Sequence, residues 1–156
     1  MRFNYRTDGF VLLSELAGSL LHIPVAASTK IEKGHAVFDN GSGYAIDTTA
    51  DMTSLVLGIS AAEADNSSGS AGDIEVVVIP LLPQHRWLVP VADRLILITD
   101  RGTRCDLSSS STGKVDVDDT TIASGAGFMI EDYDSSADAV AINTYGYAIG
   151  HFDYVS

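Results

Sequence analysis

The feature that most constrains the fold is a pair of short apolar runs separated by a small polar loop. Residues 55–59 and 74–79 are rich in β-branched side chains and too short for buried helices. Residues 66–72 between them are Asn, Ser, Gly and Ala, which bury little apolar surface. The runs therefore predict a long β-hairpin. Gly58 is interpreted as a bend in a small barrel, since a glycine inside a strand weakens packing unless the strand bends or another backbone approaches.

Short apolar runs and turns continue along most of the chain. Asn40-Gly41 is a strong hairpin signal because both residues accept positive φ. Prolines, which remove backbone donors, interrupt the middle of the chain and favour a module boundary after Leu82. The sequence predicts an all-β protein of small barrel or sandwich modules with tight hairpins, and it contains no exact internal repeat. The expected parts are an N-terminal arm (1–22), a β-barrel module (23–82) and a second β-rich module (83–156) packed on the first.

The first 22 residues differ from the rest of the chain. Asp8 can cap a helix, and the leucines that follow recur at helical spacing, so a short amphipathic helix is one alternative and an extended arm is the other. The segment either docks on a partner or packs on the barrel as an ordinary element. We expect helix to be confined to this segment and at most one turn elsewhere, with 95–98 and 140–142 as strands.

Charge excludes some classes of partner. The formal net charge is −12, and residues 41–80 and 115–156 contain no Lys or Arg. Such a surface repels a phosphate backbone, so no nucleic-acid partner is expected. No apolar run is long enough for a membrane span and the N-terminus lacks a standard signal, so we expect a soluble chain with no membrane partner.

No pattern in the sequence predicts catalysis, a metal or a cofactor. The single Cys105 cannot form an intrachain disulfide and is expected to be a small buried hydrophobe. The four histidines lack metal-ligand spacing, and no serine lies in a nucleophile elbow. The acidic segment 132–138 lacks the glycine and glutamate of a calcium loop and is interpreted as a solvated turn. We therefore expect a protein that is not an enzyme.

Several motifs follow one another in a recognisable order. Lys33-Gly34-His35-Ala36-Val37 precedes a glycine turn, then come residues 57–64, a Ser/Gly loop and residues 72–78, with weaker matches at 87–89, 127–130 and 140–143. This order resembles the capsid decoration, or cement, proteins of tailed bacteriophages. The resemblance implies a β-rich, head-stabilising subunit, often a homotrimer. It would be made in the host cytoplasm, bind the major capsid protein on the outer surface of the virion and tie neighbouring capsomers together. It supplies no catalytic residues.

The N-terminal arm is the expected docking element. It mixes basic, aromatic and leucine side chains, and the first forty residues are neutral overall, whereas the acidic loops around Asn66 and Asp134 are expected to face solvent. Arg86–Arg104 is the second candidate. Deleting residues 1–20 is expected to leave a folded barrel that no longer binds particles. The predicted capsid-docking residues are Arg2, Phe3, Tyr5, Leu12, Leu13, Leu16 and Leu20.

The two strands of the predicted hairpin are apolar on both faces and therefore need cover on two sides. One cover is expected to be another subunit. The predicted oligomer interface consists of Leu57, Ile59, Val76, Val78 and Trp87.

Three alternatives remain open at this point. A glycan-binding virion or adhesin module would use Trp87 with Tyr145 or Tyr147 as stacking platforms. A β-clip type enzyme would need a polar pocket around His35 or His85 in which carboxylates converge. A non-viral oligomeric shell component is the third.

Overall fold

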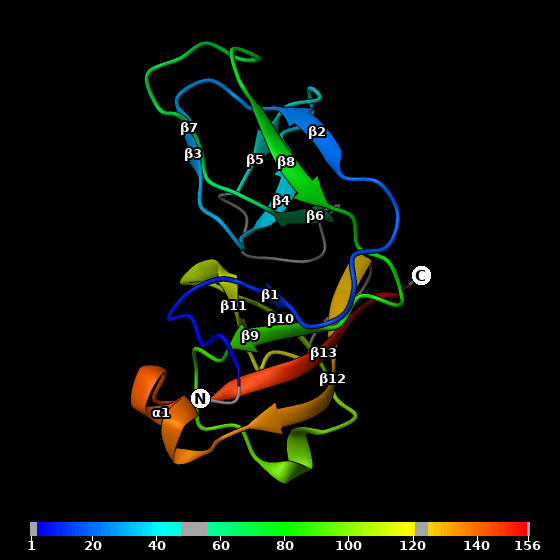
Figure 1. Cartoon of the computed structure of the whole chain (residues 1–156), viewed down its shortest axis with the longest axis vertical. Helices are drawn as coiled ribbons and strands as arrows, with labels where there is room; N and C mark the ends of the chain where they lie inside the picture. The colour runs from blue at the N-terminus through cyan, green and yellow to red at the C-terminus, as the bar shows by residue number, and fades with distance from the viewer. Residues whose placement is uncertain (1–2, 48–55, 121–124, 156) are drawn as a thin grey trace.

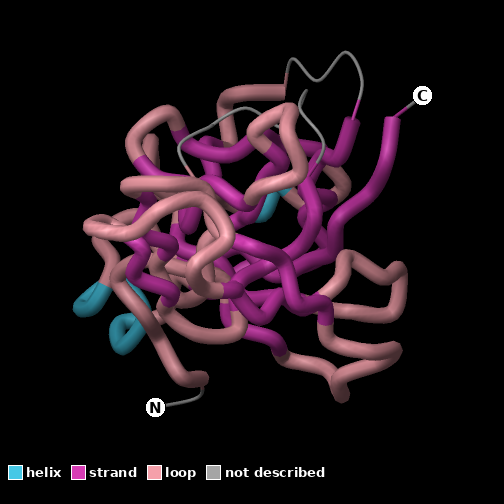
Figure 2. The backbone as a smooth tube through the Cα atoms, turned by 90° about the horizontal axis from the view of Figure 1, so that it is seen from above, coloured by secondary structure: helices cyan, strands magenta, loops and turns pink. Residues whose placement is uncertain are grey.

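The computed structural model describes residues 3–47, 56–120 and 125–155. Figure 1 shows two stacked β units, one from each half of the chain, with the N-terminal segment lying on the second unit before it crosses to the first. Helix occupies only short segments (Figure 2). The predicted all-β class is confirmed. Leu55 of the predicted hairpin and Arg2 of the predicted docking set lie outside the described residues.

The first half forms a five-stranded antiparallel sheet with the order β2-β8-β6-β4-β5. A parallel bridge between Val25 and Ala45 joins its two outer strands, so the sheet curls into a small barrel. A separate ribbon, β3-β7, lies beside it. The strands are β2 (Leu21–Pro24), β3 (Thr29–Ile31), β4 (Ala36–Asp39), β5 (Ala45–Ile46), β6 (Val56–Ser60), β7 (Ala64–Asn66) and β8 (Glu75–Ile79).

The second half forms the sheet β9-β13-β12-β10-β11, and a strand of the N-terminal arm, β1, is added at the β9 edge. A parallel bridge between Val91 and Val115 again brings the outer strands of the five together. The elements are β1 (Val11–Leu12), β9 (Trp87–Pro90), the 3₁₀ turn η1 (Ile98–Asp100), β10 (Arg104–Ser108), β11 (Ser111–Asp116), β12 (Gly125–Asp134), α1 (Ala137–Ile142) and β13 (Tyr147–Val155).

The two barrels have the same topology. Numbered in chain order, the five strands of each have the spatial order 1-5-4-2-3. The backbone hydrogen bonds match as well: Ala26 N–Ala45 O (3.1 Å) corresponds to Ala92 N–Val115 O (2.9 Å), and Gly34 N–Ser60 O (2.9 Å) corresponds to Gly102 N–Ile130 O (2.7 Å). The chain is therefore a structural repeat.

This repeat was not predicted from the sequence, because few residues are identical at equivalent positions of the two barrels. The available signal was Pro24-Val25-Ala26 and Pro90-Val91-Ala92, each followed by a basic residue and a glycine, at Gly34 and Gly102. Both glycines have positive φ, near +82°, which non-glycine residues seldom adopt. A short tripeptide and a glycine thus mark equivalent positions in two barrels whose other residues differ.

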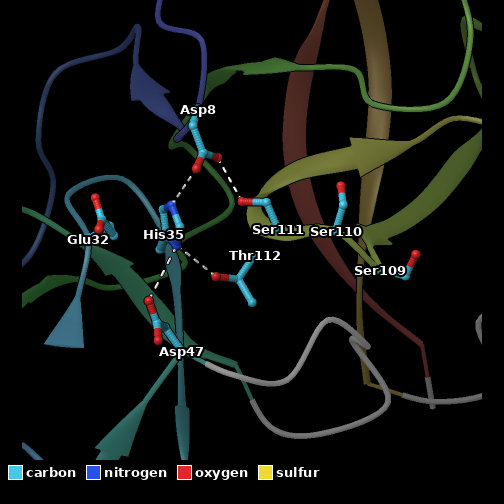
Figure 3. A pocket seen from close by; sticks show the side chains of 8 residues that line it. All are labelled: Asp8, Glu32, His35, Asp47, Ser109, Ser110, Ser111 and Thr112. Carbon is cyan, nitrogen blue, oxygen red and sulfur yellow. Dashed lines mark hydrogen bonds and ion pairs between the residues drawn. The ribbon is translucent and has the colours of Figure 1, made fainter. Parts of the chain in front are cut away.

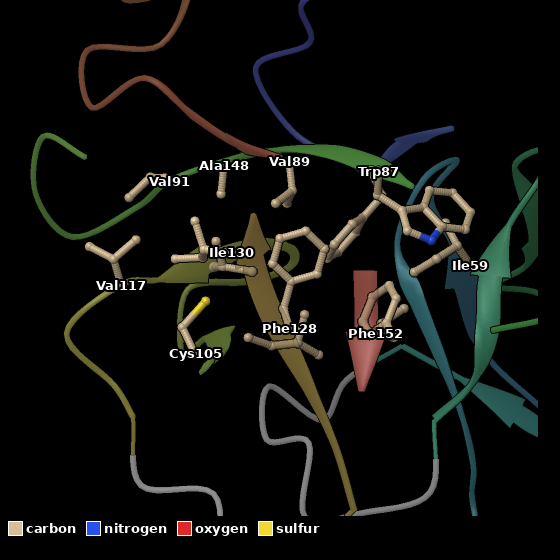
Figure 4. Packing of buried hydrophobic residues seen from close by; sticks show 14 of the residues in the cluster. Ile59, Trp87, Val89, Val91, Cys105, Val117, Phe128, Ile130, Ala148 and Phe152 are labelled. Carbon is tan, nitrogen blue, oxygen red and sulfur yellow. The ribbon is translucent and has the colours of Figure 1, made fainter. Parts of the chain in front are cut away.

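One hydrophobic core joins the two barrels and the arm. The main cluster contains Phe38 and Ile59 from the first barrel and Trp87 and Phe128 from the second (Figure 4). Phe10 of the arm lies among the aromatic rings, with ring-centroid distances of 6.2 Å to Trp87 and 5.7 Å to Phe128. A second cluster, which includes Val25, Val37 and Val78, belongs to the first barrel alone. The shared cluster therefore joins the barrels, and the first barrel has in addition a core of its own.

The predicted hairpin is partly confirmed. β6 and β8 pair in antiparallel fashion through Ile59 and Ile79. The segment between them is not a simple loop, because β7 pairs with β3 and Asn66 is buried, its Nδ2 donating to Ala26 O and Ser70 O. At Gly58, a Cβ would lie 2.3 Å from Ile79 O, so close approach of a backbone, rather than a bend alone, requires glycine there.

The helix predicted near the N-terminus is wrong. Residues 11–12 form strand β1 against β9, and Leu13 N donates to Arg86 O at 2.8 Å. An isolated helix of that length is marginal, and pairing with an exposed strand edge satisfies the same backbone groups. Among the described residues, no helix is long and apolar enough to cross a bilayer.

Helix occurs instead where a turn and a strand were predicted. In α1, Ser136 is the N-cap and its hydroxyl accepts a hydrogen bond from Ala139 N. Residues 95–97 are not a strand in the structure, and η1 follows them. Asp134 does not face solvent: it is buried and accepts hydrogen bonds from the Tyr5 hydroxyl and from Ser136 N.

Burial of Tyr5 and Phe10 overturns the expectation that residues 1–20 can be removed without loss of the fold. We expect Phe10→Ala to lower the free energy of unfolding by about 3 to 5 kcal/mol, because a ring is removed from the shared core. Leu16 is 47% exposed. Leu16→Ala is therefore the control, with an expected change of at most about 0.5 kcal/mol. Urea unfolding of both variants measures the difference, and equal small effects would contradict the role of Phe10.

Candidate functional site

A polar pocket of about 490 Å³ lies where the arm, the first barrel and the second barrel meet (Figure 3). Asp8 comes from the arm, His35 and Asp47 come from the first barrel, and Thr112 comes from β11 of the second. The remaining lining residues are Glu32, Ser109, Ser110 and Ser111. The pocket therefore depends on the packing of three segments that are distant in sequence.

His35 lies at the centre of this group. Its Nε2 is 3.0 Å from Asp8 Oδ2, and its Nδ1 is 3.4 Å from Asp47 Oδ2 and 3.0 Å from Thr112 Oγ1. Asp8 is held in turn by Ser111, whose hydroxyl donates to Oδ1 at 2.7 Å. Figure 3 shows these side chains converging on the imidazole from different elements.

The two carboxylates favour the charged form of His35. Burial alone would lower its pKa, but hydrogen bonds to Asp47 and Asp8 and their negative charges raise the pKa to about 9. Burial tends to raise the pKa of Asp8, but hydrogen bonds from His35 and Ser111 outweigh it, so that this pKa is lowered. At neutral pH, His35 is therefore an imidazolium between carboxylates, and both ring nitrogens donate.

This protonation state decides what the pocket can do chemically. A hydroxyl, an imidazole and a carboxylate lie in line, as in a hydrolytic triad. A general base must be able to accept the hydroxyl proton, and a doubly protonated ring cannot. Thr112 is also buried. Among the described residues, no group of His, Cys, Asp and Glu side chains could hold a metal ion. The arrangement is an ion-pair cluster that ties the arm to both barrels.

The other candidate histidine, His85, has a structural role. It is fully buried, its Nδ1 lies 2.8 Å from Pro80 O, and its Nε2 accepts a hydrogen bond from Ala17 N at 2.9 Å. These partners assign a neutral ring with the proton on Nδ1. His85 therefore fastens the arm to the connection between the barrels. Cys105 is buried as expected, and burial raises the pKa of its thiol.

A second feature is a group of exposed apolar side chains on the second barrel. Leu97 is 49% exposed and Ile98 is 64% exposed. Ile96 between Leu95 and Leu97 is buried, and its backbone N–H donates to Tyr145 O. The chain is extended here, so its alternating side chains point inward and outward. We call the exposed group, Leu95, Leu97, Ile98 and Tyr145, the distal apolar patch.

The loop that carries this patch is rigidly held. Arg94 binds Asp100 with two hydrogen bonds of 2.9 and 2.7 Å, and its Nε lies 2.8 Å from Asp118. Asp100 also accepts a hydrogen bond from Leu97 N at 2.7 Å. Charged hydrogen bonds between Arg94 and Asp100 therefore fix the backbone of the loop that exposes the leucines to solvent.

The structural repeat provides an internal comparison for the patch. In the first barrel, His35 N donates to Glu32 O as Thr103 N donates to Asp100 O in the second, so Lys30 is equivalent to Ile98. Lys30 is exposed and forms ion pairs with Glu63 (3.0 Å) and Glu32 (3.7 Å). A charged side chain thus occupies this position in one barrel, whereas an exposed isoleucine occupies it in the other.

The predicted docking residues divide into two groups. Tyr5 is buried against Tyr147, and Phe3, Leu12 and Leu13 pack on the chain's own clusters. Leu16 and Leu20 remain exposed. The structure thus uses much of the arm internally. The distal apolar patch, which lies mostly inside the second candidate region 86–104, was not predicted residue by residue; its signal was the run Leu-Ile-Leu-Ile beside arginines.

The residues predicted for an oligomer interface are mostly covered by the chain itself. Ile59, Val76, Val78 and Trp87 are all buried in the single chain, and only Leu57 is partly accessible. Both faces of these strands are covered within the single chain, because the sheet curls and packs on the other barrel and on neighbouring segments. Trp87 and Tyr147 are likewise buried and cannot be stacking platforms.

Comparisons of the chain with protein-family models, with curated proteins and with solved structures found no match.

The ion-pair cluster predicts a pH dependence of stability. The folded pKa of His35, about 9, is above its unfolded value of 6.5, so the stabilisation is complete below pH 6.5 and is lost as the pH rises through 9. We expect His35→Gln to cost on the order of 2 to 3 kcal/mol near pH 6 and much less near pH 10. Unfolding free energies at both pH values test this, with the exposed His22→Gln as control. A difference that stays constant with pH would refute it.

Proposed function

We propose that this chain is a structural decoration protein that binds the outer surface of a viral capsid and stabilises it by bridging capsomers. The observation that carries the proposal is the distal apolar patch on a rigid loop. Its support from sequence is the order of motifs around Lys33-Gly34-His35 and residues 57–78, which resembles capsid decoration proteins. A protein of this class needs a preformed surface for another protein and no reaction centre.

The patch has the properties of a protein-docking surface. Exposed apolar side chains that cluster on a monomer mark interaction sites more often than chance. The Arg94–Asp100 fork fixes the loop before binding, which reduces the entropy lost on association. In the first barrel the equivalent of Ile98 is Lys30, which forms ion pairs, so the fold does not itself require an apolar side chain there.

Charge favours this end of the chain for docking. The formal net charge is −12, whereas segment 86–104 contains four arginines against Asp93 and Asp100. Three of these arginines form ion pairs with acidic side chains: Arg86 with Glu131, Arg94 with Asp100 and Asp118, and Arg104 with Asp153. The pairs neutralise most of the charge here, so this end repels an acidic partner surface less than the segments that contain no base.

The proposal includes a homotrimer, and its only basis is the resemblance to capsid decoration proteins. A cyclic assembly would multiply weak contacts with several capsomers through effective concentration. Because most of the residues nominated for subunit contact are buried in one chain, the trimer contact must use other surfaces. The glycan-binding alternative would need Trp87 with Tyr145 or Tyr147 as stacking platforms; Trp87 and Tyr147 are buried, and Tyr145 is exposed without the tryptophan beside it at the surface.

The β-clip type enzyme is the second candidate, and the convergence of Asp8, Asp47 and Thr112 on His35 is the observation that favours it. It requires a neutral imidazole at working pH. An NMR titration of the His35 ring distinguishes the two: we expect deprotonation near pH 9. A midpoint near 6.5 would leave a free base at neutral pH and support the enzyme instead.

We expect Leu97→Asp and Ile98→Asp each to weaken particle binding at least about 30-fold, since a central interface residue contributes about 2 kcal/mol or more. Both side chains are exposed, so the fold should be retained. The measurement is co-sedimentation with shells of the virus that carries the chain. Leu20→Asp, on the arm, is the matched control. Loss of particle binding in Leu20→Asp but not in the patch variants would show that the arm is the attaching surface. Failure of the wild-type chain to sediment with the shells would refute the proposed function.

A further inference from the structure

A second pocket, of about 210 Å³, lies under the arm at the junction of the two barrels. Its floor and walls are mainly apolar, and its basic residues come from the arm and from the turn before β4. Its lining includes Arg6, Phe10, Lys33, Ile59, Ile79 and Trp87. Among the described residues that line it there is no carboxylate, which is unusual in a chain of net charge −12.

Trp87 supplies a donor without an acceptor. Its side chain is 1% exposed, and the indole Nε1 has no hydrogen-bond partner among the described residues. Figure 4 shows the nitrogen on the edge of the ring that lies beside Ile59, another residue of the pocket lining. A buried N–H without an acceptor costs roughly 1 to 3 kcal/mol. The nitrogen itself is enclosed, so an oxygen reaches it only when the side chains that line the pocket move apart.

Two cations at the same pocket also lack a counter-ion. Arg6 donates from Nε to Asp8 O and makes a long contact with Lys33 O, both of which are backbone carbonyls. Within the described part of the chain, neither Arg6 nor Lys33 forms an ion pair, whereas Lys30, Arg86, Arg94 and Arg104 all do. Positive charge is therefore left available at an apolar pocket.

From these features we infer that the pocket binds a small carboxylate with an apolar tail. The tail replaces water against Phe10, Ile59 and Ile79, and the anionic oxygens meet Arg6 and Lys33, with the indole N–H as a further donor. Only an acceptor-rich, negatively charged group complements all three donors. An amine or a neutral apolar molecule satisfies fewer of them.

The size of the pocket limits the ligand. A volume of 210 Å³ corresponds to about seven water molecules at roughly 30 Å³ each, which is smaller than the usual drug-sized site. A chain of about six carbons with a terminal carboxylate fits this space. With so few atoms, affinity in the millimolar range is expected.

The chain contains a single Trp, so one indole N–H resonance reports on this pocket. We expect hexanoate to shift that resonance in a saturable way, and hexylamine and 1-hexanol to shift it at least ten-fold less at equal concentration. The wild-type full chain is titrated at constant ionic strength. Equal responses to hexanoate and hexanol, or no saturable response to hexanoate, would overturn the inference and leave water as the partner of Nε1.

The charge requirement is tested at Lys33, which is exposed and outside the shared core. Lys33→Glu is expected to weaken hexanoate binding at least ten-fold. Lys30→Glu, in the preceding strand β3 and outside the pocket lining, is the matched control and should bind as the wild type does. Equal affinity for hexanoate in Lys33→Glu and the wild type would refute the role of the cations. Neither result depends on particle binding.

Discussion

The joining of the two barrels and the arm depends on one hydrophobic cluster that all three build together. Phe10 lies between the aromatic rings of the second barrel, and Phe38 and Ile59 of the first barrel join the same cluster. Small domains bury a smaller share of their surface and are marginally stable, so a shared cluster is a direct way to stabilise two of them. The polar junction follows from this packing. Once the arm is held by Phe10, Asp8 is brought beside His35, and Gly9 N reaches Gly113 O at 2.9 Å.

Repetition of one topology makes the differences between the barrels informative. Equivalent backbone positions are occupied by His35 in the first barrel and Thr103 in the second, since the carbonyl of each accepts a hydrogen bond from the matching strand, from Ser60 N and Ile130 N respectively. Only His35 meets carboxylates from another segment. At another equivalent exposed position, the first barrel has the charged Lys30 and the second has Ile98. Because the backbone is the same, these contrasts reflect what each barrel contacts and not what the fold needs.

The two pockets at the junction have opposite character. The pocket around His35 satisfies its own charges, because the imidazolium lies between Asp8 and Asp47. The pocket under the arm leaves Arg6, Lys33 and the Trp87 N–H without acidic partners among the described residues. A group whose charges are internally paired stabilises the fold, whereas unpaired donors around an apolar surface favour a ligand. The distal apolar patch differs from both, since it lies on a convex loop and suits a large protein partner.

The sequence by itself determined the all-β class, because short β-branched runs between glycine turns are too brief for helices, and it determined that β6 and β8 pair and that Cys105 is buried. It also located the basic region 86–104. Only the tertiary structure decided where the leucines of the arm go, since their helical spacing competes with strand pairing against β9, and the edge of a formed sheet wins. The convergence of Asp8, His35, Asp47 and Thr112 was equally beyond sequence, because these residues belong to three segments separated along the chain. Burial of Trp87 and exposure of Leu97 were decided in the same way: local pattern shows that a side chain is apolar, but only the packing of both barrels determines which apolar side chains find cover.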